Sequence, residues 1–290
     1  MTVTAQEVVE GFRLSPQQKR VWLLQEQERP QSYCVSCSVL IEGRLDRAAL
    51  TNAVNEVIAR HEILRTTYKR LFGMTVPLQV IDDTCAIVIE PDVHHPEFDF
   101  EHGPLLHAKL SSNGDSLALT LPALCADTAG LRNLVREISD AYAKEVDPFT
   151  ERTQYADLSE WQNELLESED SETGLDYWKQ RWEADSIASH LPLKTSESGF
   201  NPQVLSVRAA RTQLATLMTC WLTVLWRSYE QSTLILGTVF SCRRSEELEK
   251  TLGLFEKYLP LRCEVDERVR FEDRFERRQR PGGVCYHAGG

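Results

Sequence analysis

One junction limits what this chain can fold into more than any other part of it. Residues 116–120 read S-L-A-L-T and alternate apolar with polar, as a half-buried strand does. From Leu131 to Tyr142, apolar residues recur at the spacing of one helix face. Residues 121–130, L-P-A-L-C-A-D-T-A-G, are therefore expected to form a strand-to-helix loop, where proteins often position catalytic groups. The ionisable side chains of this loop are Cys125 and Asp127, and it holds no histidine.

Similar patterns predict helices and consecutive strands along the first half of the chain. Helices are expected after Ser15 and after Asp46, which are typical capping residues. Asn113-Gly114 is typical of a tight hairpin turn and would join strands 105–110 and 116–120. Further strands are predicted at 32–42, 64–68, 78–81 and 86–89. This order of elements indicates an α+β fold.

Four short motifs follow one another at wide separations. They read L-S-P-Q-Q-K-R-V-W-L-L-Q (14–25), R-H-E-I-L-R-T-T-Y (60–68), Q-Y-A-D-L-S-E-W-Q (154–162) and L-G-L-F-E-K-Y-L-P-L-R (252–262). In this order the chain resembles the condensation domains of nonribosomal peptide synthetases, which belong to the chloramphenicol acetyltransferase-like superfamily. Four collinear motifs are far more specific than one short pattern. The resemblance implies an α+β, chloramphenicol acetyltransferase-like sandwich of two lobes.

The resemblance also implies how the chain is divided. We expect a complete N-terminal condensation-like lobe at 1–182, a Ser-rich linker at 183–202, a partial second lobe at 203–265 and an irregular tail at 266–290. The second lobe would begin with a helix at 209–230. Because the family continues with further strands and helices, the chain is expected to be a fragment, a frameshifted reading frame or a decayed gene product.

The family's active-site motif, H-H-x-x-x-D-G, falls on the junction loop. Aligned through Asp127, its two histidines correspond to Pro122 and Ala123, and its glycine to Thr128. The resemblance implies that the second histidine orients or deprotonates an acceptor amine as the amine attacks a thioester. Ala123 has no lone pair and no exchangeable proton, so it can do neither. A positioned acid-base group contributes about 10²–10⁴-fold in rate, and position 123 lacks one.

Asp127 is the motif residue that this chain keeps. The resemblance implies a salt bridge between Asp127 and Arg65, the second arginine of the R-H-E motif. We expect this pair to hold the loop against the N-terminal helix, so that the scaffold of the site persists without its base. Removing one partner of a buried pair costs about 3–5 kcal/mol.

Other residues that could supply the missing chemistry have simpler interpretations. His94 and His95 stand in H-H-P-E-F-D-F, which is typical of a solvated loop; a displaced catalytic pair is the alternative. Cys125 would need a lowered pKa and a base partner to act as a nucleophile, and we expect a small buried thiol instead. His61 is expected to pack at the end of its helix.

Charge and composition narrow the possible partners and location. The chain has 32 Lys and Arg against 44 Asp and Glu, a formal net charge of −12, which argues against binding to nucleic-acid backbones. It shows neither an apolar run of membrane-spanning length nor a signal-peptide pattern, so we expect a cytoplasmic protein with reduced thiols and no membrane partner. Cys34 and Cys37 form a C-x-x-C without a second ligand pair, so no metal site is expected.

These features lead to two main hypotheses. The first is a condensation-like domain that is related to amide-bond formation between carrier-bound thioesters but is itself inactive, as a remnant or a docking module. Its partners would be peptidyl or acyl carrier domains, neighbouring synthetase modules and, as a further candidate, a tailoring enzyme. No cofactor would bind directly, and only the phosphopantetheine arms of partner carriers would enter. The alternative is an active acyl or peptidyl transferase that relies on positioning, and a hydrolase using Cys125 is a third.

Overall fold

The computed structural model describes residues 10–27, 33–91, 98–145, 152–181, 214–229 and 233–265. Contacts between Cα atoms divide the chain into two compact units. The first combines Met1–Ser168 with Ser241–Lys257, and the second combines Glu169–Phe240 with Tyr258–Gly290. A segment from late in the chain therefore belongs to the same unit as the strand-to-helix loop.

The first unit contains a four-stranded sheet with the order β2-β7-β6-β5. β7 (Ser116–Pro122) pairs antiparallel with β2 (Cys34–Leu40) on one side and with β6 (His107–Leu110) on the other. β5 (Glu90–Pro91) pairs parallel with β6. The predicted hairpin joins β6 to β7, and Gly114 takes the positive φ of 76° that glycine allows. The alternating pattern of 116–120 thus gives the central strand that leads into the loop.

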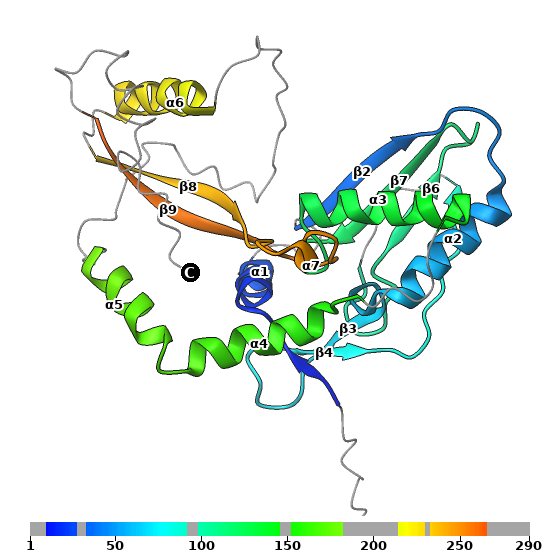
Figure 1. The fold of residues 1–290 in the computed structure, drawn as a ribbon, viewed down its shortest axis with the longest axis horizontal. Coiled ribbons are helices and arrows are strands. Elements are labelled where there is room, and N and C mark those ends of the chain that lie inside the picture. Colours follow the sequence, from blue (N-terminus) through cyan, green and yellow to red (C-terminus); the bar gives the residue numbers. More distant parts are fainter. Residues whose placement is uncertain are drawn as a thin grey trace, which may run out of the picture. The chain divides into compact units, whose positions relative to one another are not determined.

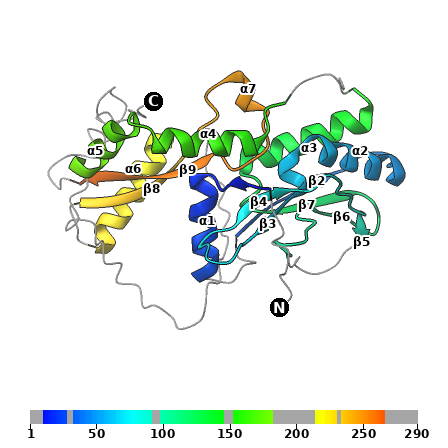
Figure 2. The ribbon, with the colours of Figure 1, turned by 90° about the horizontal axis from the view of Figure 1, so that it is seen from below.

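Two helices, α2 (Arg47–Arg60) and α3 (Thr128–Ala143), cover the same face of this sheet (Figure 1, Figure 2). The predicted cap at Asp46 is confirmed, since its carboxylate accepts hydrogen bonds from the N–H groups of Ala48 and Ala49 at 2.9 and 3.1 Å. The apolar residues that face the sheet are almost fully buried; they include Leu50, Val54, Val57, Ile58, Leu131, Leu134 and Ile138. These contacts fix the start of α3, and with it the end of the loop.

A second, smaller sheet in the same unit has the order β1-β4-β3, with β1 at Phe12–Arg13, β4 at Leu78–Ile81 and β3 at Thr66–Lys69. A 3-10 turn, Glu62–Arg65, precedes β3, and the helices α1 (Pro16–Gln27) and α4 (Tyr155–Glu167) complete this part. α1 begins with a capping box. The N–H of Ser15 donates to Gln18 Oε1 at 2.9 Å, and the N–H of Gln18 donates to Ser15 Oγ at 3.1 Å.

The second unit contains α5 (Ser171–Arg181), α6 (Leu214–Tyr229) and most of two paired strands, β8 (Thr233–Ser241) and β9 (Glu256–Glu264). Its buried residues form a small cluster of their own, made by Leu222, Leu234, Cys263 and Val265. The short helix α7 (Glu246–Glu249) lies between β8 and β9 in the sequence and belongs to the first unit.

The strand predicted at 86–89 is wrong. Ile87 pairs with a side chain instead: its N–H donates to Asn55 Oδ1 at 2.9 Å, and its carbonyl accepts from Asn55 Nδ2 at 3.2 Å. Because the amide of Asn55 satisfies this backbone from α2, the segment needs no strand partner. An apolar alternation alone cannot distinguish these two arrangements.

The division into units differs from the expected boundaries in two places. α5 belongs to the second unit although it lies within 1–182, and Ser241–Lys257 belongs to the first unit although it lies within 203–265. The expected linker 183–202 and tail 266–290 lie outside the described residues. Among the described helices, none has the length and apolar character needed to cross a membrane.

Candidate functional site

The strand-to-helix loop is held by backbone hydrogen bonds at its β7 end and by a side-chain cap at its α3 end. At the β7 end, the N–H of Ala123 donates to the carbonyl of Tyr33 at 2.9 Å, and the N–H of Cys125 donates to the carbonyl of Pro122 at 2.9 Å. At the α3 end, Asp127 is the N-cap residue, and its Oδ1 accepts from the N–H of Gly130 at 2.7 Å. The sequence expectation of a loop between strand and helix is therefore confirmed.

The second carboxylate oxygen of Asp127 accepts hydrogen bonds from Ser241–Lys257, which we call the late segment. Oδ2 accepts from Arg243 Nη1 at 2.6 Å and from the N–H groups of Phe255 and Glu256 at 2.9 and 3.1 Å. The Asp127 side chain is completely buried and that of Arg243 is 5% exposed. Both carboxylate oxygens of Asp127 are therefore used in bonds that hold the loop, one of them with an arginine partner.

Arg243 also organises the segment that covers the loop. Its Nη2 donates to the carbonyls of Thr251 and Gly253 at 3.3 and 3.2 Å, and its guanidinium carbon lies 4.1 Å from the centre of the Phe255 ring. One side chain thus contacts both Asp127 and the backbone that directly precedes the two residues whose N–H groups donate to Asp127. Arg243 acts as the link between the loop and residues 251–256.

The predicted salt bridge between Arg65 and Asp127 is wrong. Arg65 lies in the 3-10 turn, where its Nη2 is 3.6 Å from Glu62 Oε1 and its Nη1 donates to the backbone carbonyl of Asp82. Asp127 is instead paired with Arg243, which the sequence analysis did not single out. One sequence signal was available: Arg243 and Arg244 form the only adjacent arginine pair between the β8 pattern and the L-G-L-F motif.

Three of the four sequence motifs meet at one tyrosine. The hydroxyl of Tyr155, from the Q-Y-A-D motif, donates to the carbonyl of Leu254 at 2.6 Å and lies 2.8 Å from Ser15 Oγ. Gly253 has a φ of +147°, and a Cβ there would lie 2.0 Å from the Tyr155 ring. No side chain fits at this contact, so the glycine of L-G-L-F is required by packing.

A buried network of side-chain hydrogen bonds joins the loop to neighbouring elements of the first unit. Gln18 Nε2 lies 3.1 Å from the carbonyl of Leu124, 2.9 Å from Gln79 Oε1 and 3.2 Å from the hydroxyl of Tyr68. Gln79 in turn donates to Ser159 Oγ at 3.2 Å. Gln18 and Gln79 are each at most 1% exposed. Their bonds tie the loop to α1, β4 and α4, and buried networks of this kind hold when every member is satisfied.

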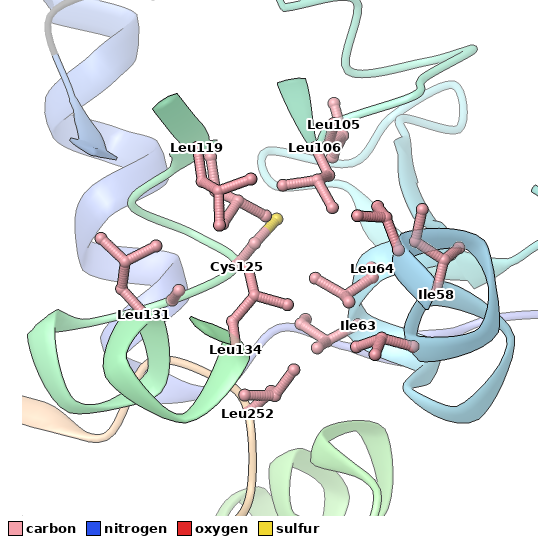
Figure 3. Close-up of a cluster of buried hydrophobic side chains, with 14 of the residues drawn as sticks. Ile58, Ile63, Leu64, Leu105, Leu106, Leu119, Cys125, Leu131, Leu134 and Leu252 are labelled. Atoms are coloured by element: carbon pink, nitrogen blue, oxygen red, sulfur yellow. The ribbon is translucent and has the colours of Figure 1, made fainter. Parts of the chain in front are cut away.

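Cys125 is buried among leucines, as Figure 3 shows. Its sulfur lies close to Leu119, and Leu131 and Leu134 of α3 belong to the same cluster. Burial raises the pKa of the Cys125 thiol to about 12, although a hydrogen bond with Tyr68, 3.7 Å away, opposes this shift. A thiol in this environment is protonated near neutral pH and is a poor nucleophile. The interpretation of Cys125 as a small buried thiol is confirmed.

His61, a described histidine of the R-H-E motif, is packed and does not replace the missing base. His61 is 3% exposed, and its Nε2 lies 3.6 Å from Glu137 Oε2. Burial acts to raise the pKa of Glu137, but the neighbouring His61, Arg152 and Arg60 lower it overall. His61 is thus a packed histidine at the end of α2, as expected. His94 and His95 lie outside the described residues.

The loop therefore offers little acid-base chemistry at its accessible position. Ala123 is partly exposed, whereas Cys125 and Asp127 are buried and occupied by other contacts. Within the part of the chain that the structure describes, no three His, Cys, Asp or Glu residues gather closely enough to hold a metal ion. The hydrogen bonds of Asp127 with Gly130, Arg243, Phe255 and Glu256 form what we call the frame of the site. At position 123, where the family motif places its second histidine, the side chain is a methyl group.

The fold and this loop define a protein of the chloramphenicol acetyltransferase-like class. The family model for the condensation domain matches residues 9–215. The chain therefore belongs to the condensation domain family. This match includes the loop and three of the four motifs, and the structure adds the late segment that binds Asp127.

Curated relatives are large synthases. Chondramide synthase cmdD of Chondromyces crocatus is 28% identical over 87% of this chain and 8% of its own length. Bacitracin synthase 3 of Bacillus licheniformis is 27% identical over 88% of this chain and 4% of its own length. The chain thus spans less than a tenth of the length of these relatives.

Solved structures show the same fold at low sequence identity. The condensation domain of the monacolin K polyketide synthase MokA has a TM-score of 0.74 and 19% identity, over 89% of this chain and 69% of that chain. SgcC5 from Streptomyces globisporus has a TM-score of 0.75 and 21% identity, over 91% and 71%. The fold expected from the motifs is confirmed.

Proposed function

We propose that this chain is a condensation domain that does not itself form amide bonds and that serves within a nonribosomal peptide synthetase assembly as a docking module or a remnant. One observation carries the proposal. The frame of the site around Asp127 is fully bonded, whereas position 123 presents a methyl group. The bonds of Asp127 stabilise the loop, and position 123 has no group that could transfer a proton.

Neither neighbouring acid can take over this role. Proton transfer needs a group within hydrogen-bond reach of the reacting amine and with a pKa near the working pH. Both oxygens of Asp127 are occupied by Gly130, Arg243, Phe255 and Glu256, and burial raises the pKa of Cys125 to about 12. The expected loss relative to a histidine at position 123 is about 10²–10⁴-fold in rate.

The partners follow from the family and are part of the proposal. Carrier domains would present acyl or peptidyl thioesters on phosphopantetheine arms, and neighbouring modules of the synthetase would flank the domain, in the cytoplasm. A tailoring enzyme is a further candidate, because one structural neighbour is the X-domain from teicoplanin biosynthesis solved in a complex with OxyB. That neighbour has a TM-score of 0.73 and 22% identity, so it supports the principle of docking on this fold without naming a partner here.

The test is a condensation assay with model aminoacyl and peptidyl carrier thioesters. The natural chain is compared with Ala123→His and with Ala123→Gln, which adds a side chain of similar reach without a titratable nitrogen. The proposal predicts no amide product above the uncatalysed rate for the natural chain and for Ala123→Gln. Product from the natural chain would overturn the proposal and establish the alternative, an active transferase that needs no histidine.

A further inference from the structure

β2 is an open edge of the four-stranded sheet. The N–H of Ala123 donates to the carbonyl of Tyr33, and the N–H of Ile41 donates to the carbonyl of Asp115, so the odd-numbered residues direct their backbone groups toward β7. The even-numbered residues Cys34, Ser36, Ser38 and Leu40 therefore direct theirs away from the sheet. Among the described strands, none pairs with this edge.

This edge lacks the features that keep two edges apart. Natural edge strands are usually protected by charged side chains, prolines or bulges. β2 reads C-V-S-C-S-V-L, with no charge and no proline, and it pairs with β7 without interruption from Cys34 to Leu40. In a chain with a formal charge of −12, such a neutral strand is a place where two copies can approach.

The five central residues of β2 read the same in both directions around Cys37. Residues 35–39 read V-S-C-S-V in either direction. When two identical strands pair antiparallel about a twofold axis, each residue meets its mirror position in the other copy. A palindrome therefore places like beside like, with valine beside valine and serine beside serine.

We propose that β2 pairs antiparallel with β2 of a second copy of this chain, with the twofold axis at Cys37. In this register Ser36 exchanges both of its backbone hydrogen bonds with Ser38 of the second copy, and Cys34 does so with Leu40. The residues involved are those whose backbone groups point away from β7, so the register uses the open donors and acceptors. The two sheets become one continuous sheet.

Apolar contacts support the same register. Val35, Cys37 and Val39 are half-buried on the face that packs against the core, and the second copy would cover their remaining exposed area. Leu40 is 72% exposed and would meet Cys34 on the opposite face. A contact made by one strand from each copy is small, so association is expected to be weak and concentration-dependent.

Disulfide formation between the two Cys37 residues can report on this register. Across the axis the two Cys37 residues form a non-hydrogen-bonded pair, in which Cα atoms are about 4.5 Å apart. A disulfide spans Cα separations of about 4.4–6.8 Å. Diamide can therefore oxidise the two thiols to one disulfide, itself taking up the two electrons and two protons.

The experiment measures the mass of the 290-residue chain against concentration by light scattering, and maps disulfides after brief diamide treatment by mass spectrometry. The proposal predicts a rise from 33.1 kDa toward twice that mass, and a Cys37–Cys37 peptide as the main cross-link. Cys37→Ser should abolish this cross-link, whereas Cys34→Ser should leave it.

A second pair of variants tests the edge itself. Ser38→Pro removes an N–H that points away from the sheet, which an edge strand tolerates, and it should weaken association about tenfold or more. Ser38→Thr keeps the N–H and the hydroxyl and should associate like the natural chain. A monomer at all concentrations, or a dimer whose cross-link does not involve Cys37, would overturn the proposal even if Ser38→Pro failed to fold.

Discussion

The two ends of the loop between β7 and α3 lie four residues apart and have opposite characters. At Asp127, both carboxylate oxygens are bonded, and four donors from three parts of the first unit converge on one buried side chain. At Ala123, the backbone N–H is bonded and the side chain offers no polar atom. The difference teaches that the groups that hold this loop and the group that would perform chemistry are separate, so one can be lost without the other.

The sharpest test of the Asp127 end is Arg243→Met. Removing the arginine leaves a buried carboxylate without its cationic partner, which should lower the free energy of unfolding by about 3–5 kcal/mol. Arg244→Met is the matched control, because Arg244 is exposed, and it should change stability by less than about 0.5 kcal/mol. Urea unfolding of both variants measures the difference. Equal stabilities would show that the Arg243–Asp127 pair does not hold the loop.

The contact of Gly253 with Tyr155 tests how tightly the late segment is packed against the loop. Gly253→Ala places a Cβ 2.0 Å from the Tyr155 ring at a backbone angle that alanine rarely adopts, and it should cost about 3 kcal/mol. Gly174→Ala, in α5 with open space around it, should instead be neutral or stabilising by up to about 1 kcal/mol. In thermal unfolding, only Gly253→Ala should lower the melting temperature if this packing is as described.

Tyr155→Phe isolates the hydroxyl that joins three motifs. The change leaves the carbonyl of Leu254 and the hydroxyl of Ser15 without this partner, and it should lower the free energy of unfolding by about 2 kcal/mol. Tyr229→Phe is the control, since no hydrogen bond of its hydroxyl is found among the described residues, and it should have little effect. If both variants unfold at the same urea concentration, the hydroxyl bridge is unimportant.

The pH dependence of stability reports on the middle of the loop. Burial holds the pKa of Cys125 at about 12 in the folded chain, against about 8.5 for an exposed thiol. Above about pH 8.5 the unfolded chain therefore loses this proton before the folded chain does, so stability falls as pH rises, by up to about 1.4 kcal/mol per pH unit.

Urea unfolding from about pH 8 to 10, which covers the lower part of the interval between these two pKa values, measures this slope. Cys125→Ala should be less stable at every pH because it leaves a cavity, but its slope over this range should be smaller. An unchanged slope would mean that Cys125 titrates as an exposed thiol and that the loop is open.

Much of this molecule could be predicted from local patterns. The cap at Asp46, the hairpin at Asn113-Gly114 and the loop between β7 and α3 depend on neighbouring residues, and the structure confirms all three. The absence of a base at position 123 is likewise visible in the sequence alone. Such features are set by chain neighbours, so periodicity and capping rules find them.

What could not be predicted depends on contacts between distant parts of the chain. Asp127 was expected to pair with Arg65, but Arg243 reaches it because Ser241–Lys257 belongs to the first unit. Ile87 was expected in a strand, but the side chain of Asn55 takes up its backbone groups. In both cases the chemical type of interaction was foreseeable, and the choice of partner was made by tertiary packing.

The role of position 123 is best tested by the pH profile of amide formation by the natural chain and by Ala123→His, with the same carrier thioesters at the same concentrations. The natural chain should form no product above background at any pH. Any product formed by Ala123→His should rise with pH as an imidazole near pKa 6.5 loses its proton. Product from the natural chain, within tenfold of the variant and without this titration, would contradict the account.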